Sequence, residues 1–203
     1  MKKLHKKEKL YYNSHMKNLW YIFLFSFISF PFSGKAENIV FFSPRGNCEK
    51  MIVDRINTSE KNIDAAVYSI NNDNIVEALL NAKKRGVKIR ILTDKTQAKG
   101  HSSKVKYLHD NGINIRVHSQ FKIEHNKFAI YDKTKGSTGS FNWTNPAEKK
   151  NSENCIFFDN EDGTVDDYSK RFEYLWRINT REKSENWINK HFKIATTPEN
   201  SKK

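Results

Sequence analysis

The stretch that decides the fold is His125-Asn-Lys127-Phe-Ala-Ile-Tyr-Asp132, which is followed by Gly139-Ser140-Phe-Asn142. The apolar residues around these polar ones predict two successive strands, over Lys122–Tyr131 and Ser137–Phe141. In a strand, residues i and i+2 project from the same face. His125 and Lys127 are therefore expected to project together, and so are Ser140 and Asn142. Two adjacent strands would then bring an imidazole, an ammonium, a hydroxyl and an amide around one small volume.

Such a cluster of polar groups is suited to bind a phosphodiester. Lys127 supplies positive charge, Ser140 and Asn142 supply hydrogen-bond donors, and His125 supplies a nucleophile that titrates near neutral pH. A polar cluster on a face that would otherwise belong to the core is costly unless it is paired or has a function. The pattern therefore indicates phosphodiester chemistry.

The His-x-Lys triplet alone carries little information in this lysine-rich chain. It begins at His5, His15, His125 and His191, and only the copy at His125 has an aspartate, Asp132, five residues after its lysine. Asp132 is an odd number of positions from both His125 and Lys127, so on a regular strand it points to the opposite face.

Outward from this stretch, strands and helices alternate along the chain. Gly86 and Gly112 follow two of the predicted helices, and the basic residues Lys83, Lys84 and Arg85 occupy the last turn of one of them. The remaining strands are expected at Ile39–Phe42, Ile63–Tyr68, Val87–Leu92, Ile113–Val117 and Asn154–Phe158. Helices are expected at about 46–60, from Asn72 or Asp73 to Arg85, at Ser102–Asn111 and at about Thr164–Ile178. This order predicts an α/β fold in which a mixed β-sheet is flanked by helices on both faces.

The spacing His125-x-Lys127-x4-Asp132-x6-Gly139-Ser140-x-Asn142 resembles the HKD signature of the phospholipase D superfamily. The continuation, from Gly139-Ser-Phe-Asn-Trp-Thr144 to Lys150-Asn-Ser-Glu-Asn154, is similar to the small bacterial Nuc-type endonucleases of that superfamily. The likeness extends over about Val40–Trp176. It implies the phospholipase D/nuclease fold, with one HKD domain in this chain.

The resemblance also implies roles for six residues. His125 would attack phosphorus and form a phosphohistidine, while Lys127 and Asn142 would bind the non-bridging oxygens. Ser140 would join the hydrogen-bond network around the phosphate. Glu153 lies where the family has a carboxylate that orients the nucleophilic imidazole, and Asp132 completes the signature in a structural role.

A single copy of the motif has a consequence for assembly. The family mechanism resembles a relay in which one histidine attacks and a second protonates the leaving oxygen. Because this chain has one such histidine, we expect a symmetric homodimer whose active site lies across the two-fold axis. The same resemblance implies that no metal and no cofactor takes part.

The charge of the chain divides into two parts of similar size. The 203 residues include 36 Lys and Arg against 23 Asp and Glu, a net charge of +13. Residues 1–36 carry seven lysines and one glutamate, so +7 remains on residues 37–203. A positive balance favours a polyanionic partner.

Residues 1–36 have the layout of an export signal, with Met1 or Met16 as the start. A basic front precedes the apolar run Leu19–Phe30, and Gly34-Lys-Ala36 ends the segment with small residues. Cleavage would place the protein in the periplasm or outside the cell; the alternative is a membrane anchor formed by residues 19–32. The catalytic domain is then expected over 37–178, and 179–203 as a polar C-terminal tail that includes a loosely docked helix.

Three functions remain open at this stage. The leading prediction is a phosphodiesterase, most simply a non-specific endonuclease acting on DNA or RNA. The alternative is a phospholipase D that hydrolyses phosphatidylcholine-type lipids to phosphatidic acid at a membrane. A third is a non-enzymatic binding module for nucleic acid or an anionic surface, which the full set of polar groups disfavours.

Several residues have two interpretations each. Cys48 and Cys155 either pair in an oxidising compartment or remain as packed thiols. Tyr68 either borders the site or belongs to the core, and Trp143 is expected to pack rather than stack on bases. His101, His109, His118 and His191 show no partner pattern and are expected to be solvated.

Overall fold

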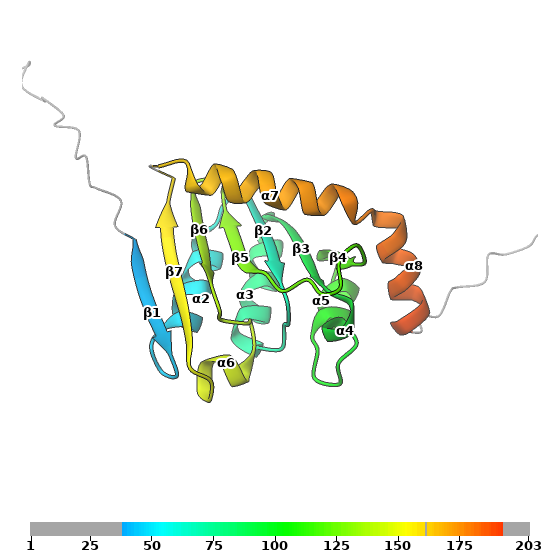
Figure 1. Cartoon of the computed structure of the whole chain (residues 1–203), viewed down its shortest axis with the longest axis horizontal. Helices are drawn as coiled ribbons and strands as arrows, with labels where there is room; N and C mark the ends of the chain where they lie inside the picture. The colour runs from blue at the N-terminus through cyan, green and yellow to red at the C-terminus, as the bar shows by residue number, and fades with distance from the viewer. Residues whose placement is uncertain (1–37, 161, 193–203) are drawn as a thin grey trace, which may run out of the picture. The chain divides into compact units, whose positions relative to one another are not determined.

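The computed structural model describes residues 38–160 and 162–192 (Figure 1). The expected export signal or anchor over 1–36 lies outside these residues, as do residues 193–203 of the expected C-terminal tail. Within the described residues, no helix combines the length and apolar character that a membrane crossing requires.

One mixed sheet of seven strands forms the centre of the fold, in the order β1-β7-β6-β5-β2-β3-β4. Strands β2, β3 and β4 run parallel, whereas β5 runs antiparallel to β2, and β6, β7 and β1 continue the antiparallel pairing. The strands are β1 Ile39–Ser43, β2 Asn62–Val67, β3 Lys88–Asp94, β4 Asn114–His118, β5 Lys127–Tyr131, β6 Lys135–Gly139 and β7 Glu153–Asp159.

Helices cover both faces of the sheet, as the sequence predicts. On one face, α2 and α3 bury Ile52, Ile56 and Leu79 in the larger apolar cluster. On the other, α7 runs across the strands and buries Phe172 and Leu175 against residues of β2, β3 and β5 (Figure 1). The helices are α2 Cys48–Thr58, α3 Asp73–Lys84, α4 Lys95–Ala98, α5 Val105–Asp110, α6 Asn145–Lys149, α7 Thr164–Ile178 and α8 Arg181–Phe192.

The helix limits that depend on local signals agree with the sequence prediction. Asn72 is the N-cap of α3, and its side chain accepts a hydrogen bond from the Ile75 N–H. Gly86 follows the helix with φ of 95°, a conformation that glycine adopts without strain. The bounds of α7 are the predicted ones.

One predicted strand is too long, another is displaced by two residues, and two short helices were not predicted. Residues 122–126 are not part of β5, and β6 ends at Gly139 rather than at Phe141. The missed helices are α4, which the Asp94 side chain caps, and α6, which Thr144 caps. Such four- and five-residue helices are too short to show an apolar period.

The expected C-terminal helix is present as α8 and packs closely rather than loosely on the edge strand β4. Ile188 is fully buried, and the hydroxyl of Ser184 accepts a hydrogen bond from the Val117 N–H at 3.1 Å. The C-terminal part of the described chain therefore completes the core beside β4.

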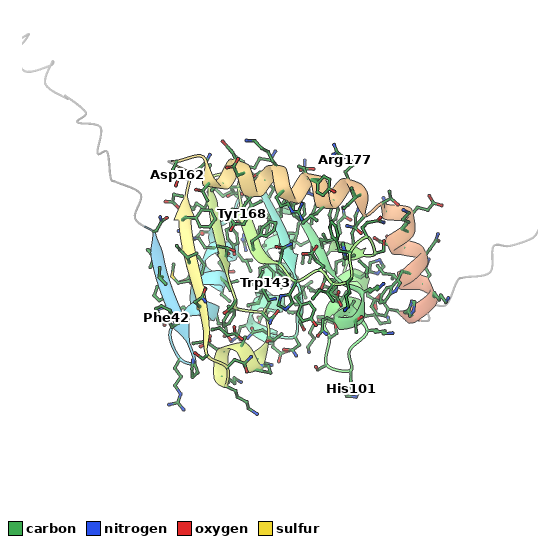
Figure 2. All side chains as sticks on the ribbon, viewed as in Figure 1. Phe42, His101, Trp143, Asp162, Tyr168 and Arg177 are labelled. Carbon is green, nitrogen blue, oxygen red and sulfur yellow. A yellow bond between two sulfur atoms is a disulfide. The ribbon has the colours of Figure 1, made fainter. Side chains whose placement is uncertain are left out.

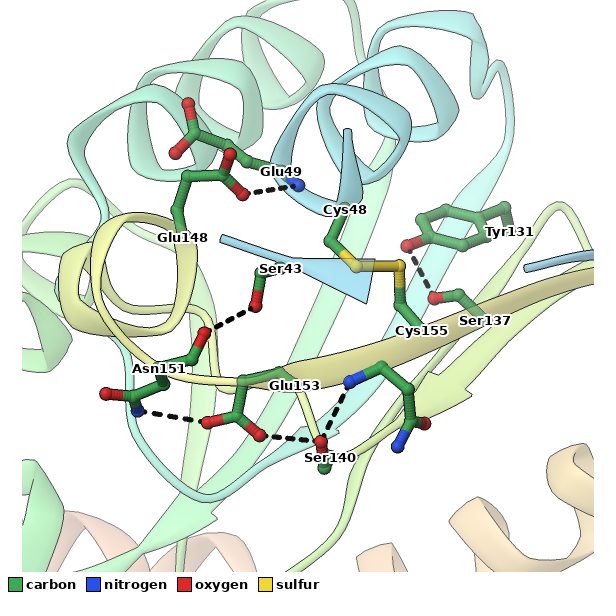
Figure 3. Close-up of a disulfide and its surroundings, with 11 residues drawn as sticks. Ser43, Cys48, Glu49, Tyr131, Ser137, Ser140, Glu148, Asn151, Glu153 and Cys155 are labelled. Atoms are coloured by element: carbon green, nitrogen blue, oxygen red, sulfur yellow. Dashed lines mark hydrogen bonds between the residues drawn. A yellow bond between two sulfur atoms is a disulfide. The ribbon is translucent and has the colours of Figure 1, made fainter. Parts of the chain in front are cut away.

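Cys48 and Cys155 form a disulfide between the first residue of α2 and strand β7 (Figure 3). Their Cα atoms are 6.0 Å apart although 107 positions separate them in the sequence. A crosslink of that span removes much of the conformational freedom of the unfolded chain, which stabilises the fold by about 3–5 kcal/mol. The sequence left this pairing open because the spacing alone does not bring the two residues together.

Candidate active site

The candidate residues gather at one edge of the sheet, where β2, β3, β4 and β6 end and β5 and β7 begin. This arrangement follows from the strand directions. His125 precedes β5 directly, Ser140 follows β6, and Glu153 is the first residue of β7. Five of the six predicted site residues therefore share this edge, and Asp132 does not.

His125 reaches the site on the connection from β4 to β5, residues 119–126, which crosses the ends of β3 and β2. The Glu124 N–H donates to Oδ2 of Asp94 at the end of β3, at 3.1 Å. The Tyr68 N–H, just after β2, donates to the Asn126 carbonyl at 2.9 Å. These tertiary hydrogen bonds replace the strand pairing that the sequence predicts for residues 122–126.

His125 and Lys127 both contact the ring of Tyr68, although His125 is not in the strand. Nζ of Lys127 donates to the carbonyl of His125 at 2.7 Å. The ring of Tyr68 contacts both, with its centroid 4.7 Å from that of His125 and 4.9 Å from Nζ of Lys127. The Tyr68 hydroxyl accepts a hydrogen bond from Gln97 at 3.0 Å, which helps to hold the ring in place. Tyr68 therefore borders the site.

The two groups differ in their exposure. His125 is exposed, whereas Lys127 is only 9% exposed. Burial lowers the pKa of Lys127, and the carboxylates of Glu153 and Glu124 oppose that shift. A partly desolvated ammonium interacts strongly with an anion that enters beside it.

Ser140 and Asn142 lie on the second connection that crosses this edge. After β6 the chain passes the start of β5 and reaches the end of β2, where Trp143 forms a bridge with Ile70. Gly139 allows this path because a Cβ atom there would lie 2.3 Å from the carbonyl oxygen of Asn154. The prediction that Ser140 and Asn142 share a face of a regular strand is therefore wrong, but both lie at the same edge of the sheet as His125 and Lys127. Trp143 is buried, as expected (Figure 2).

Ser140 already has partners within the fold. Its hydroxyl donates to Oε2 of Glu153 at 2.6 Å and accepts a hydrogen bond from the Asn154 N–H at 3.0 Å (Figure 3). Oε1 of Glu153 accepts from the Asn151 amide at 3.0 Å. The described residues show no hydrogen bond from Glu153 to the His125 imidazole, so the orienting role of Glu153 stays a prediction.

Asn142 has an amide group without an internal partner. Its Oδ1 atom is buried and accepts no hydrogen bond from any described residue. A buried polar atom without a partner is costly in a folded protein. Only a ligand that donates a hydrogen bond would satisfy this oxygen, whereas phosphate oxygens would accept from the amide N–H groups of Asn142.

Comparisons with known proteins agree with this geometry. The family model described as "Cardiolipin synthase, PLD-like domain" matches residues 52–176, more than half of the chain. The chain belongs to the phospholipase D superfamily. The crystal structure of Nuc from Salmonella typhimurium, described as a phospholipase D family member, matches with a TM-score of 0.67 and 32% identity, over 70% of this chain and 95% of that one.

Curated relatives carry lipid-related names. The chain is 41% identical to a phospholipase D of Rickettsia prowazekii over 118 residues, which are 58% of each chain. It is 31% identical to a mitochondrial cardiolipin hydrolase of Xenopus laevis over 118 residues, which are 58% of this chain and 56% of that protein. The match thus spans less than two thirds of the length of these relatives.

The aspartate of the phospholipase D signature, Asp132, lies at the opposite edge of the sheet. Its carboxylate accepts hydrogen bonds from the backbone N–H groups of Glu60, Lys61 and Asn62 at 2.7–2.9 Å. Burial raises the pKa of Asp132, but these three donors outweigh burial and hold it below the ordinary value. Asp132 therefore ties the turn after β5 to the start of β2, a structural role of the kind that the resemblance implies, and it lies away from the other five predicted site residues.

Sequence reasoning missed the buried polar groups beneath the His125 connection. His118 and Glu124 are each 1% exposed, so the expectation that His118 is solvated is wrong. His109 is also mostly covered, and it faces Asp110 and Glu185. The partners of His118 come from segments up to 61 positions away, so no local pattern points to them.

We predict that Asp132→Asn lowers stability without lowering turnover. Loss of the charged acceptor should reduce the free energy of unfolding by about 1–3 kcal/mol at pH 7. The contribution of this carboxylate is fully present above its ordinary pKa of 3.8 and is lost as the pH falls through the lower pKa of the folded protein. The difference between variant and wild type should therefore shrink below about pH 4. Urea unfolding from pH 3 to 8 measures it, and a loss of turnover in fully folded variant would contradict the structural role.

Proposed function

We propose that the protein is a phosphodiesterase that cleaves nucleic acid through a phosphohistidine on His125. The observation that carries the phosphodiester chemistry is that exposed His125 and buried Lys127 both contact the ring of Tyr68, with Nζ of Lys127 bonded to the His125 carbonyl. Membership of the phospholipase D superfamily supports the same reaction.

The proposed reaction has two steps. A ring nitrogen of His125 attacks phosphorus, the N–P bond forms and the P–O bond to the leaving alcohol breaks, with a proton supplied by a second histidine. Water then attacks the phosphohistidine, the second histidine takes a proton from it, and the N–P bond breaks. Lys127 and Asn142 hold the non-bridging oxygens and stabilise the charge that develops on them.

The choice of nucleic acid rests on a set of basic side chains around this edge, here called the basic rim. They lie on the β1–α2 connection, on and after α4, on the β4–β5 connection and at the end of α6. None of them forms an ion pair with another described residue, and all are exposed or half-exposed. The basic rim consists of Arg45, Lys95, Lys99, Lys122, Lys149 and Lys150. A polyanion with regularly spaced phosphates matches such a distribution of charge.

A phospholipase D activity is the second candidate, and a specific feature favours it. Phe121 and Ile123, on the same connection as His125, expose 45% and 48% of their surface beside Lys122. Exposed apolar residues next to a cation suit the surface of an anionic membrane. The names of the curated relatives point the same way.

A homodimer supplies the second histidine in this proposal. Each chain carries one HKD motif, and the exposed position of His125 leaves it accessible to the same residue of a partner subunit. A two-fold axis through the site would then give each phosphate one attacking and one protonating histidine.

We also propose that the domain works in an oxidising compartment after export. The Cys48–Cys155 disulfide supports this, because disulfides persist in the periplasm and outside cells and are rare in the cytosol. Residues 1–36 would serve as the signal, with anchoring through residues 19–32 as the alternative.

The first prediction concerns the substrate. Purified protein incubated with plasmid DNA, RNA and phosphatidylcholine vesicles in EDTA should cleave the nucleic acids and leave the lipid intact. His125→Ala should keep its fold by circular dichroism and lose turnover by more than about 10³-fold, because the nucleophile is missing. Lipid hydrolysis without nucleic-acid cleavage would replace nuclease by phospholipase D, and loss of activity in EDTA would contradict a metal-independent reaction.

The second prediction concerns the basic rim. Reversal of three charges, in Lys122→Glu/Lys149→Glu/Lys150→Glu, should lower DNA cleavage at low salt by at least about 10-fold and flatten its salt dependence. Hydrolysis of the small diester bis(p-nitrophenyl) phosphate should change little. The matched control is Lys88→Glu/Lys135→Glu at the opposite edge, which should leave both activities unchanged. If the rim variant loses DNA cleavage and hydrolysis of the small diester to the same extent, an electrostatic role in DNA binding is refuted.

The third prediction concerns the dimer. Unfolded wild-type and His125→Ala chains, mixed in equal amounts and refolded together, should show about one quarter of the wild-type activity if each site needs two histidines. Independent sites would give about one half. A fully active monomer by light scattering would exclude a shared site.

A further inference from the structure

Four polar side chains are buried beneath the connection that carries His125. Asp94, His118 and Glu124 are each 1% exposed, and Asn179 is fully buried. They come from the end of β3, the end of β4, the connection itself and the residue after α7. Burial of three titratable groups in one place is costly unless they are hydrogen-bonded, and a satisfied polar network can fix one arrangement of the chain more specifically than an apolar core.

Glu124 holds the backbone on both sides of His125. Its Oε1 accepts hydrogen bonds from the backbone N–H of Asn126 at 3.2 Å and from the Asn126 side-chain amide at 2.6 Å. Its own N–H donates to Asp94 Oδ2 at 3.1 Å. His125 therefore lies between Glu124 and Asn126, which are hydrogen-bonded to each other, and Glu124 is also hydrogen-bonded to strand β3 through Asp94. The Asn126 carbonyl extends this link to Tyr68.

His118 and Asn179 hold the other end of the same connection. Nε2 of His118 accepts the Phe121 N–H, and its Nδ1 lies 3.7 Å from Oε2 of Glu124 and 3.2 Å from the Asn179 amide. Asn179 accepts the Ser119 N–H at 3.0 Å and donates to the Leu175 carbonyl at 2.9 Å. Burial lowers the pKa of His118 although Glu124 and Asp94 are near. The neutral ring therefore joins the connection to the end of α7.

We propose that Glu124 is a positioning residue that fixes the imidazole of His125 against the ring of Tyr68. It acts through its acceptor oxygen on Asn126 rather than on the substrate. The inference rests on the proposed reaction at His125, because a fixed imidazole matters for turnover only where it attacks phosphorus. Misplacement of a reacting group by about 1 Å costs about 10²-fold in rate.

The test compares two variants of Glu124 on bis(p-nitrophenyl) phosphate. Glu124→Ala removes the acceptor and should lower kcat by about 10–100-fold with KM within about 2-fold of wild type. Glu124→Gln replaces the carboxylate by an amide whose oxygen can still accept the hydrogen bonds from Asn126. It should restore kcat to within about 3-fold of wild type. Thermal unfolding of each variant gives the folded fraction. Asp64→Ala is the matched control, because Asp64 is also a buried carboxylate but pairs with Arg90 under α7. This substitution should lower stability without lowering kcat.

A second readout does not depend on activity. The ring C–H signals of His125 in NMR spectra, assigned by their loss in His125→Ala, should move in Glu124→Ala as the Tyr68 ring current is lost, and return in Glu124→Gln. Unchanged signals in Glu124→Ala would overturn the positioning role, as would equal damage by Ala and Gln. If the wild type is inactive but the His125 signals still move in Glu124→Ala and return in Glu124→Gln, the positioning role stands and the proposed function is excluded.

Discussion

The site depends on one constraint, the insertion of the antiparallel strand β5 between β2 and β6. Because β5 starts at the edge where β4 ends but lies beyond β3 and β2, the chain must cross the ends of these strands to reach it, and the segment after β6 crosses the same edge as well. The first crossing carries His125 from β4 to β5, and the second carries Ser140 and Asn142 from β6 to the end of β2. The candidate catalytic side chains, which come from distant parts of the sequence, lie near the start of β5, whose first residue is Lys127.

The rest of the fold makes this edge rigid. Apolar layers on both faces of the sheet hold the strand ends in place, and the Cys48–Cys155 disulfide joins α2 to β7 two residues after Glu153. At the opposite edge, Asp132 closes the turn after β5 with three backbone hydrogen bonds. The Asn142 amide oxygen is buried without a partner among the described residues, and it is the amide N–H groups of Asn142 that would donate to a bound phosphate.

Local patterns predict what is decided locally, and tertiary contacts decide the rest. The start of α3 at Asn72 or Asp73 and the limits of α7 follow from residue type and periodicity alone. The strand predicted over Lys122–Tyr131 fails because Asp94 and Tyr68 bind the backbone of residues 124 and 126 from other strands. The expectation that His118 is solvated fails because its partners are distant in sequence, and for the same reason no local pattern points to Glu124. Ser140 and Asn142 reach the edge near His125 outside any regular strand, since Gly139 lets the chain leave β6 beside Asn154.

The central claim is that the His125 imidazole becomes covalently bound to phosphorus during turnover. The most direct measurement is mass spectrometry of protein quenched at high pH, where phosphohistidine survives, during reaction with a slow phosphodiester substrate. The account predicts a phosphoryl adduct on the peptide that contains His125, which is absent from His125→Ala and decays as product forms. Turnover at the wild-type rate with no adduct, or an adduct on another residue that persists in His125→Ala, would contradict it.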